Sequence, residues 1–295
     1  MCSSDLALAD GRPVVALEST ITSSFGLPAP HNRDCFERVD RAIRAVGAVP
    51  AVTGVLDGRM IAGVEEEEVE RILAGDWKLA ERDLPIALAR RASIGVSTVS
   101  ATVAIAHLAG IRTFATGGIG GVHRGAESSF DVSSDLGAMA RHPVIVVSAG
   151  AKAFLDLPKT VEYLETLGVP VVGYRCSEFP AFWSRSSGIS LPHRADSPAD
   201  IATIATAAES SGWSGGILVA NPIPASAEIP SAEIAAAIDT GLAVAAREGA
   251  VGPTATPRVL AAIAEATASR SIPANLALAE SNATLAAQIA VELTR

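Results

Sequence analysis

Short runs rich in Val and Ile alternate with longer amphipathic segments along most of the chain, and these patterns predict strands and helices. The predicted strands are Pro13–Leu17, Val49–Thr53, Thr113–Thr116, Val144–Ser148, Val169–Gly173 and Gly216–Ala220. The predicted helices between them include Asn32–Val46, Glu65–Ala74, Thr98–Ala109, Val161–Leu167 and Pro198–Ser210. Strand–helix alternation predicts an α/β fold with a layered, mostly parallel sheet flanked by helices. In such folds the active site lies at the carboxyl ends of the strands.

Two regions depart from this alternation. A turn with the sequence LDGR at Leu56–Arg59 predicts a small β-hairpin near residues 49–64. After Glu228 the pattern is almost wholly helical, with segments at Ser231–Arg247 and Pro257–Thr267 and a last one ending at Arg295. Because no low-complexity linker and no repeat of fixed period divides the chain, we expect residues 1–295 to form a single domain.

The location of the protein can also be predicted from sequence. The longest uncharged stretch, Ala92–Ile111, is rich in alanine and hydroxyl residues and is interrupted by glycine, so we expect a buried helix rather than a membrane span. Residues 1–6 lack a basic region followed by an apolar one, so we expect no signal peptide. The three cysteines, Cys2, Cys35 and Cys176, are too far apart for a disulfide framework or a zinc knuckle. These features together predict a cytoplasmic protein.

The charge balance argues against one class of partner. The chain has 295 residues, a formal net charge of −9, no basic run and only 4% aromatic residues, which disfavours nucleic-acid binding. We therefore expect a small-molecule substrate, with neither a nucleic acid nor a membrane as partner. The 23 basic residues include only three lysines, at Lys78, Lys152 and Lys159. Either a compact amine is needed at these positions, or the chain has drifted toward arginine.

Two predicted strand ends carry groups suited to acid–base and nucleophilic chemistry. Glu18 follows the strand Pro13–Leu17, where partial desolvation would raise the pKa of its carboxyl group and suit it to general-acid work. Lys152 follows the strand Val144–Ser148 and a turn of small residues, where desolvation would leave a neutral amine able to form an imine with a sugar aldehyde. The alternatives are a turn or helix-capping carboxylate for Glu18, and a solvent-reaching or ion-paired side chain for Lys152.

Two further segments suit charged ligands. Four glycines in five positions follow Thr116 and precede His123, so their N–H groups would form an anion-binding nest unless the segment is only a tight surface turn. The segment matches neither a Walker loop nor a dinucleotide fingerprint. Asp131 and Asp135, with hydroxyl residues between them, would lie on one face of a helix start. There they would cap the helix or hold Mg²⁺ or Mn²⁺.

Several segments together resemble the pseudouridine-5′-phosphate glycosidase family, and the likeness extends from about Gly11 to the end of the chain. These segments are Val15–Ile21, Arg82–Pro85, Ala115–Glu127, Ser148–Lys152, Glu178–Phe182, Ala220–Pro224 and Leu285–Ala290. The glycine-rich segment Ala115–Glu127 is highly specific, and it occurs together with the Ser-Ala-Gly-Ala-Lys sequence of Ser148–Lys152.

The resemblance implies reversible cleavage of the C–C glycosidic bond of pseudouridine 5′-phosphate to ribose 5-phosphate and uracil, in a homotrimer with a Mn²⁺-supported site. By position, Lys152 matches the family's imine-forming nucleophile, Glu18 its proton donor and Asp131 its metal-associated carboxylate. The positions that match substrate contacts or the pocket wall are Lys78, Val99, Ser133, Ser134, Asp135, Thr98, Thr116, His123 and Asn275. In the implied mechanism Glu18 helps to open the ribose ring, and Lys152 adds at C1′ to give an imine. The glycine-rich segment, Lys78 and His123 would anchor the 5′-phosphate.

The chain departs from the family pattern after Ile21. Where the family has Ser-His-Gly-Met-Pro, residues 23–28 are Ser-Ser-Phe-Gly-Leu-Pro, so a histidine is missing and one residue is added. An inserted residue around Arg90–Ile94 also makes the match of Lys78 depend on the alignment. Two other functions remain open: a different lysine-imine sugar-phosphate lyase or aldolase, and a non-catalytic sugar-phosphate binding protein.

Overall fold

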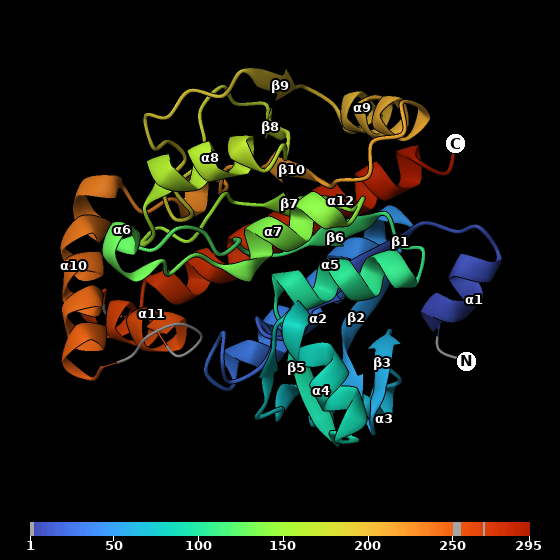
Figure 1. The fold of residues 1–295 in the computed structure, drawn as a ribbon, viewed down its shortest axis with the longest axis horizontal. Coiled ribbons are helices and arrows are strands. Elements are labelled where there is room, and N and C mark those ends of the chain that lie inside the picture. Colours follow the sequence, from blue (N-terminus) through green and yellow to red (C-terminus); the bar gives the residue numbers. More distant parts are fainter. Residues whose placement is uncertain (1–2, 250–254, 268) are drawn as a thin grey trace.

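One sheet of ten strands forms the centre of the computed structural model, which describes residues 3–249, 255–267 and 269–295 (Figure 1). Within these residues the strand order is β4-β5-β2-β1-β6-β7-β10-β8-β9, and β3 pairs with β2 beside this path. The strands are β1 Val14–Glu18, β2 Val49–Leu56, β3 Arg59–Ala62, β4 Lys78–Leu79, β5 Ile94–Ser97, β6 Thr113–Ala115, β7 Ile145–Ser148, β8 Val171–Tyr174, β9 His193–Ala195 and β10 Ile217–Ala220. Among the strand pairs of the described residues, only β2–β3 and β2–β5 are antiparallel, so the predicted mostly parallel sheet is confirmed.

Helices pack on both faces of the sheet. They are α1 Ser3–Ala9, α2 His31–Val46, α3 Glu66–Leu73, α4 Leu84–Ala89, α5 Val99–Leu108, α6 Ala126–Ser129, α7 Ser134–Arg141, α8 Leu157–Thr166, α9 Pro198–Ser210, α10 Ser231–Arg247, α11 Ala255–Ala266 and α12 Ser271–Glu292. On one face α12 packs against α2 and α9, and α5 packs against α7 on the other (Figure 1). Helices α10 and α11 form a hairpin that reaches the end of α12.

The helix α12 crosses the middle of the molecule and is buried over most of its 22 residues. Its many alanines let the helix lie close to strands β1, β6 and β7. Asn275 and Asn282 are two of the polar residues that this helix buries, together with Ser271. The Asn282 amide donates to Thr116 O (2.7 Å) and thereby fixes the point where β6 leaves the sheet. A buried polar side chain with all its partners in place favours one arrangement of its neighbours.

Most predicted elements are confirmed, with boundaries within a few residues. The hairpin near residues 49–64 forms from β2 and β3, and the region after Glu228 is helical in the residues that the structure describes. Within the uncharged stretch Ala92–Ile111, the predicted helix Thr98–Ala109 is confirmed as the buried helix α5, but strand β5 precedes it and was not predicted. Thr98 separates them in an extended conformation at the N-cap of α5. In the described part of the chain, no helix is long and apolar enough to cross a bilayer.

The sheet brings the ends of several strands to one edge. Strands β1, β6 and β7 are parallel neighbours, so their carboxyl ends lie side by side. Strand β5 is antiparallel to β2, and its end at Ser97 meets the end of β1, where the Thr20 N–H donates to Ser97 O (3.1 Å). The residues that follow four strands therefore converge on one place.

Candidate active site

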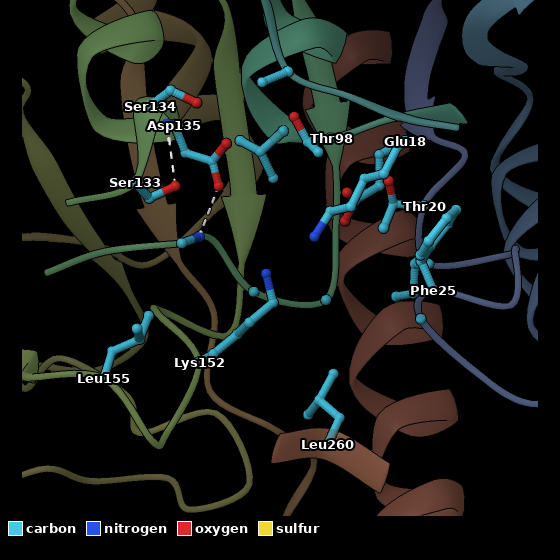
Figure 2. A pocket seen from close by; sticks show the side chains of 18 of the residues that line it. Glu18, Thr20, Phe25, Thr98, Ser133, Ser134, Asp135, Lys152, Leu155 and Leu260 are labelled. Carbon is cyan, nitrogen blue, oxygen red and sulfur yellow. Dashed lines mark hydrogen bonds between the residues drawn. The ribbon is translucent and has the colours of Figure 1, made fainter. Parts of the chain in front are cut away.

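A cavity of about 290 Å³ lies where these strand ends converge (Figure 2). Nearly all the site residues expected from the sequence line it, namely Glu18, Lys78, Thr98, Val99, His123, Asp131, Ser133, Ser134, Asp135, Lys152 and Asn275. Thr116 does not line the cavity, because it lies behind Glu18 and hydrogen-bonds to it. The fold therefore gathers the candidate acid, the candidate nucleophile and the candidate binding groups around one cavity.

A sharp turn directs Lys152 into the cavity. Gly150 has a φ of +76°, a conformation that favours glycine, and a Cβ atom there would lie 2.3 Å from Pro180 O. The Lys152 N–H donates to Ile119 O (3.1 Å), and the Ile119 N–H donates to Gly150 O (3.0 Å). These bonds tie the turn to the glycine-rich segment. In Figure 2 the Lys152 amine points into the space that the Glu18 side chain also faces.

Glu18 is a buried carboxyl group whose surroundings favour its protonated form. Its side chain ends β1, and Thr116 donates a hydrogen bond to its Oε1 atom. Burial raises the pKa of Glu18, while the positive charge of Lys152 and the hydrogen bond from Thr116 oppose the rise. A carboxyl group that keeps its proton to higher pH can act as a general acid.

Four buried hydroxyl residues behind Glu18 tie together β1, β2, β5 and α5: Ser19, Thr53, Ser97 and Thr102. Ser19 Oγ donates to Thr53 O (2.7 Å) and accepts from the Ser97 N–H (2.8 Å). The hydroxyl groups of Thr53 and Ser97 lie 2.8 Å apart, and Thr53 Oγ1 donates to Thr102 Oγ1 (2.9 Å). Because each hydroxyl is paired, the cluster holds the end of β1 and so the backbone of Glu18 in place.

One end of the cavity is suited to an anion. Lys78 lines it, and burial together with repulsion from Lys152 lowers the pKa of Lys78 to about 8, while Asp135 and Glu18 oppose the shift. Helix α5 begins beside Thr98 and helix α7 beside its N-cap Ser133, and both of these residues line the cavity. Helix N-termini present unpaired N–H groups and a partial positive charge. Two of them and a lysine therefore meet at this end.

The glycine-rich segment was expected to form an open anion-binding nest, and the structure corrects this expectation. The four glycines of residues 117–121 lack the positive φ values of a left-handed backbone. They are required by close packing instead, since a Cβ atom on Gly118 would lie 2.6 Å from the Phe182 ring and one on Gly120 would lie 2.3 Å from Ser133 Oγ. The Gly120 N–H donates to Asp135 Oδ2 (2.9 Å), so it already binds a carboxylate of the protein.

Asp135 links three segments of the site through its position in α7 and two hydrogen bonds. Its Oδ2 accepts from Gly120, and its Oδ1 accepts from the Ser100 N–H (2.9 Å) at the start of α5 (Figure 2 shows the bond to the glycine-rich segment). Asp135 itself lies in the first turn of α7. Both carboxylate oxygens therefore hold the two helix N-termini and the glycine-rich segment at fixed separations.

Asp131 lies outside helix α7, which begins at Ser134, so the prediction that Asp131 and Asp135 share one face of a helix start was wrong. Residue 132 instead bridges to Val122, and the Asp131 carbonyl accepts from the His123 N–H (3.0 Å). The ring of His123 lies 3.8 Å from the Asp131 carboxylate, and burial lowers the pKa of His123 despite this neighbour. No group of three or more His, Cys, Asp or Glu side chains with metal-binding geometry occurs in the described ranges.

Sequence reasoning missed the apolar wall of the cavity, which is formed by Phe25, Leu155, Phe182, Leu260 and Leu278. In Figure 2 Phe25, Leu155 and Leu260 lie around its edge. Phe25 occupies the segment that departs from the family pattern, and that departure was the one available signal. Phe182 ends the resembling segment Glu178–Phe182, whereas nothing in the local sequence marks Leu155, Leu260 and Leu278. Arg82 also lines the cavity, although it was noted only as part of a resembling segment.

Comparison with known proteins finds similarity along the whole chain. A family model described as "Indigoidine synthase A like protein" matches residues 5–292. A pseudouridine-5′-phosphate glycosidase of Methylobacterium nodulans is 52% identical, over 97% of this chain and 85% of the relative. One of Solibacter usitatus is 50% identical, over 97% of this chain and 96% of the relative.

Solved structures with the same fold are also found. The structure of a prealnumycin C-glycosynthase in complex with ribulose 5-phosphate has a TM-score of 0.89 and 36% identity, covering 99% of this chain and 95% of the other. The structure of an indigoidine synthase A-like protein from Thermotoga maritima has a TM-score of 0.88 and 38% identity, covering 97% and 94% of the two chains.

Proposed function

Because this chain belongs to the indigoidine synthase A-like family, we propose that it catalyses the reversible cleavage of the C–C glycosidic bond of pseudouridine 5′-phosphate. The products are ribose 5-phosphate and uracil. One observation carries the proposal: a lysine and a buried carboxyl group of raised pKa face the same cavity, and one end of that cavity suits a phosphate. Its near-full-length relatives are named for this reaction. The structural neighbour is named a C-glycosynthase, and its structure is a complex with ribulose 5-phosphate.

The first step is ring opening with attack by the lysine. A carbon leaving group cannot be expelled by protonating a glycosidic oxygen, so the proton goes to the ring oxygen O4′ instead. Glu18 donates this proton as the C1′–O4′ bond breaks, with electrons pushed from the uracil ring. Lys152, after giving up a proton to water, adds to C1′ through its amine and then loses a second proton, so that C1′ carries both the lysine nitrogen and uracil C5.

The second step breaks the carbon–carbon bond. The lysine nitrogen lone pair forms a C=N bond to C1′, and the electrons of the C1′–C5 bond stay on C5, which takes up a proton. Uracil leaves, and an imine between Lys152 and the sugar remains. Water adds to this imine, releases ribose 5-phosphate and restores the amine. The reverse sequence joins uracil to the sugar.

The test of this function is uracil release from pseudouridine 5′-phosphate, followed by chromatography, with uridine 5′-phosphate as the N-glycoside control. Release from the C-glycoside alone is expected. A lysine-imine aldolase would leave pseudouridine 5′-phosphate intact, and a non-catalytic binding protein would bind ribose 5-phosphate without turnover; either result would refute the proposal. We further propose that the protein works as a cytoplasmic homotrimer, and light scattering of the purified protein tests the trimer.

The phosphate of the substrate lies at the end of the cavity that Lys78 and the starts of α5 and α7 share. Here the cationic form of Lys78 is required, because a neutral amine offers the phosphate no charge. Lowering the pKa of Lys78 to about 8 therefore makes binding depend on pH near neutrality. The nearby N–H groups of the two helices do not titrate and bind at any pH.

We expect the affinity for inorganic phosphate, measured by calorimetry, to fall as the pH rises through about 8, the pKa of Lys78. Lys78→Arg stays charged and is expected to remove this dependence. Lys78→Met is expected to weaken binding by about tenfold or more at pH 7, the range for a hydrogen bond to a charged group. A wild-type affinity profile from pH 7 to 9.5 that matches the profile of Lys78→Arg would show that Lys78 does not hold the phosphate, because the titration of phosphate itself is common to both proteins.

We also propose a Mn²⁺ ion at Asp131. Both oxygens of Asp135 accept backbone N–H groups, whereas the Asp131 carboxylate lines the cavity and lies 3.8 Å from the His123 ring. This donor set fits a weakly held hard cation with one carboxylate ligand, the other positions being taken by water and substrate oxygens. Such an ion would offset negative charge on the substrate.

Binding of Mn²⁺, followed by the loss of its free-ion paramagnetic resonance signal, is expected to weaken by roughly 10- to 100-fold in Asp131→Asn. Removing metal from the wild-type protein with a chelator is expected to lower uracil release, and added Mn²⁺ is expected to restore it. Asp156→Asn is the matched control, since Asp156 caps helix α8 and its side chain does not line the cavity. Equal Mn²⁺ affinity of the wild type and Asp131→Asn would exclude this site.

A further inference from the structure

Trp183 and Asn275 form a buried hydrogen bond at the wall of the cavity. The Trp183 Nε1 atom lies 2.7 Å from Asn275 Oδ1. Trp183 is fully buried, and Asn275, near the start of α12, is 9% exposed and lines the cavity. The tryptophan is held on several sides: its ring packs edge-on against Phe182, with ring centroids 4.9 Å apart, and its carbonyl accepts from the Ile229 N–H (2.9 Å).

This pair determines which way the asparagine amide faces. An indole N–H can only donate, so the atom of Asn275 that it contacts has to be the carbonyl oxygen. The two ends of an amide group point in different directions from the same carbon. With Oδ1 held by Trp183, the Nδ2 group is turned away from the tryptophan.

The Nδ2 group of Asn275 faces the cavity. In the ranges that the structure describes, the one buried side-chain nitrogen or oxygen without a hydrogen-bond partner is His142 Nδ1. Asn275 hydrogen-bonds to Trp183 through Oδ1, so Nδ2 has to reach accessible space, and the cavity is the space that Asn275 lines. Trp183 thus leaves a hydrogen-bond donor directed at the ligand.

The donor belongs to a cavity whose lining includes apolar side chains close to Asn275 in the fold. Phe182, which stacks on Trp183, and Leu278, one helical turn after Asn275, line the same wall. A flat conjugated ring that carries a carbonyl oxygen matches these surroundings, because its faces can pack against the aromatic and aliphatic side chains while the oxygen accepts from the N–H donor. Uracil has this chemistry.

We propose that Trp183 is a positioning residue for base recognition, fixing the Asn275 amide so that it donates to a carbonyl oxygen of uracil. The inference rests on the proposed function and adds a specificity element to it. A site whose donor is fixed in advance loses affinity when that orientation is no longer enforced, because either amide end can then face the base.

The test is a double-mutant cycle on base binding. The KM for uracil is measured in the synthetic direction at saturating ribose 5-phosphate for the wild type, Trp183→Phe, Asn275→Ala and the double variant. Trp183→Phe is expected to raise the uracil KM by roughly three- to tenfold, the range for one neutral hydrogen bond, with an unchanged KM for ribose 5-phosphate. In the Asn275→Ala background it is expected to change the uracil KM no further, because no amide is left to orient.

Two outcomes would overturn the proposal: an equal effect of Trp183→Phe in both backgrounds, or equal losses for uracil and ribose 5-phosphate. Ser184→Ala is the matched control, since it removes a buried hydrogen bond to Ile229 O (2.7 Å) from the same loop without touching Asn275, and it is expected to leave the uracil KM unchanged. A wild-type protein that neither releases uracil from pseudouridine 5′-phosphate nor joins uracil to ribose 5-phosphate would refute the proposed function itself. That result is distinct from a failure of the proposal for Trp183.

Asn275→Asp provides a second test should Trp183→Phe fail to fold. Its carboxylate keeps accepting from Trp183 and presents an acceptor, in place of a donor, to the base. The uracil KM is then expected to exceed that of Asn275→Ala, because two acceptors face each other. A uracil KM equal to or below that of Asn275→Ala would contradict the proposed orientation.

Discussion

Lys152→Arg is expected to release no measurable uracil from pseudouridine 5′-phosphate, with turnover lowered on the order of 10⁴-fold or more, as when other covalent nucleophiles are removed. Arginine keeps the positive charge that acts on Glu18 and Lys78 in this cavity. Its guanidinium group does not lose a proton in proteins, so it cannot form the imine. The substitution therefore separates the covalent role of Lys152 from its electrostatic role.

The adduct itself can be trapped. Borohydride added to the protein with ribose 5-phosphate is expected to leave a reduced sugar on Lys152, located by peptide mass spectrometry, and none at this position in Lys152→Arg. Lys159→Arg is the matched control, because Lys159 is exposed and paired with Glu127 and Asp156 (2.9 Å each), and it is expected to keep full activity. Wild-type protein that binds ribose 5-phosphate but gives no adduct would refute the imine mechanism.

The positions of Glu18 and Lys152 could be predicted because they depend on local pattern. Each follows a short run of apolar residues, and such runs form the parallel strands β1 and β7, both neighbours of β6. Parallel strands place their carboxyl ends at one edge, so the strand assignment alone predicts that the two residues lie close together. The rarity of lysine in the chain added a second, compositional signal for Lys152.

The contacts between distant segments could not be predicted in this way. The glycines of residues 117–121 are explained by what touches them, which is Phe182 in one case and Ser133 in another. Likewise, the amide of Asn275 is oriented by a tryptophan 92 positions away along the chain. Strand β5, at the start of the uncharged stretch Ala92–Ile111, also forms by pairing with β2, and the local sequence does not reveal that pairing.

Glu18→Gln is expected to lower turnover by roughly 10²- to 10⁴-fold, because glutamine cannot supply the proton for ring opening. The same change is expected to stabilise the fold increasingly as pH rises. Burial raises the pKa of Glu18 above its ordinary value of 4.5, so between these two pKa values the folded protein holds a proton that the unfolded chain gives up. The free energy of unfolding of the wild type therefore decreases with rising pH in this window, and glutamine has no such dependence.

Thermal unfolding from pH 4 to 9 checks the stability, and the Tm difference between Glu18→Gln and the wild type is expected to grow above about pH 4.5. Thr116→Val tests the acid role by a different route. The Thr116 hydrogen bond lowers the pKa of Glu18, so its removal is expected to raise that pKa further. The alkaline decline of kcat/KM, where Glu18 loses its proton, then moves to higher pH, while a decline that stays in place would assign it to another group. Burial of Glu18 thus lowers the stability of the fold at neutral pH, and it keeps on the carboxyl group the proton that ring opening requires.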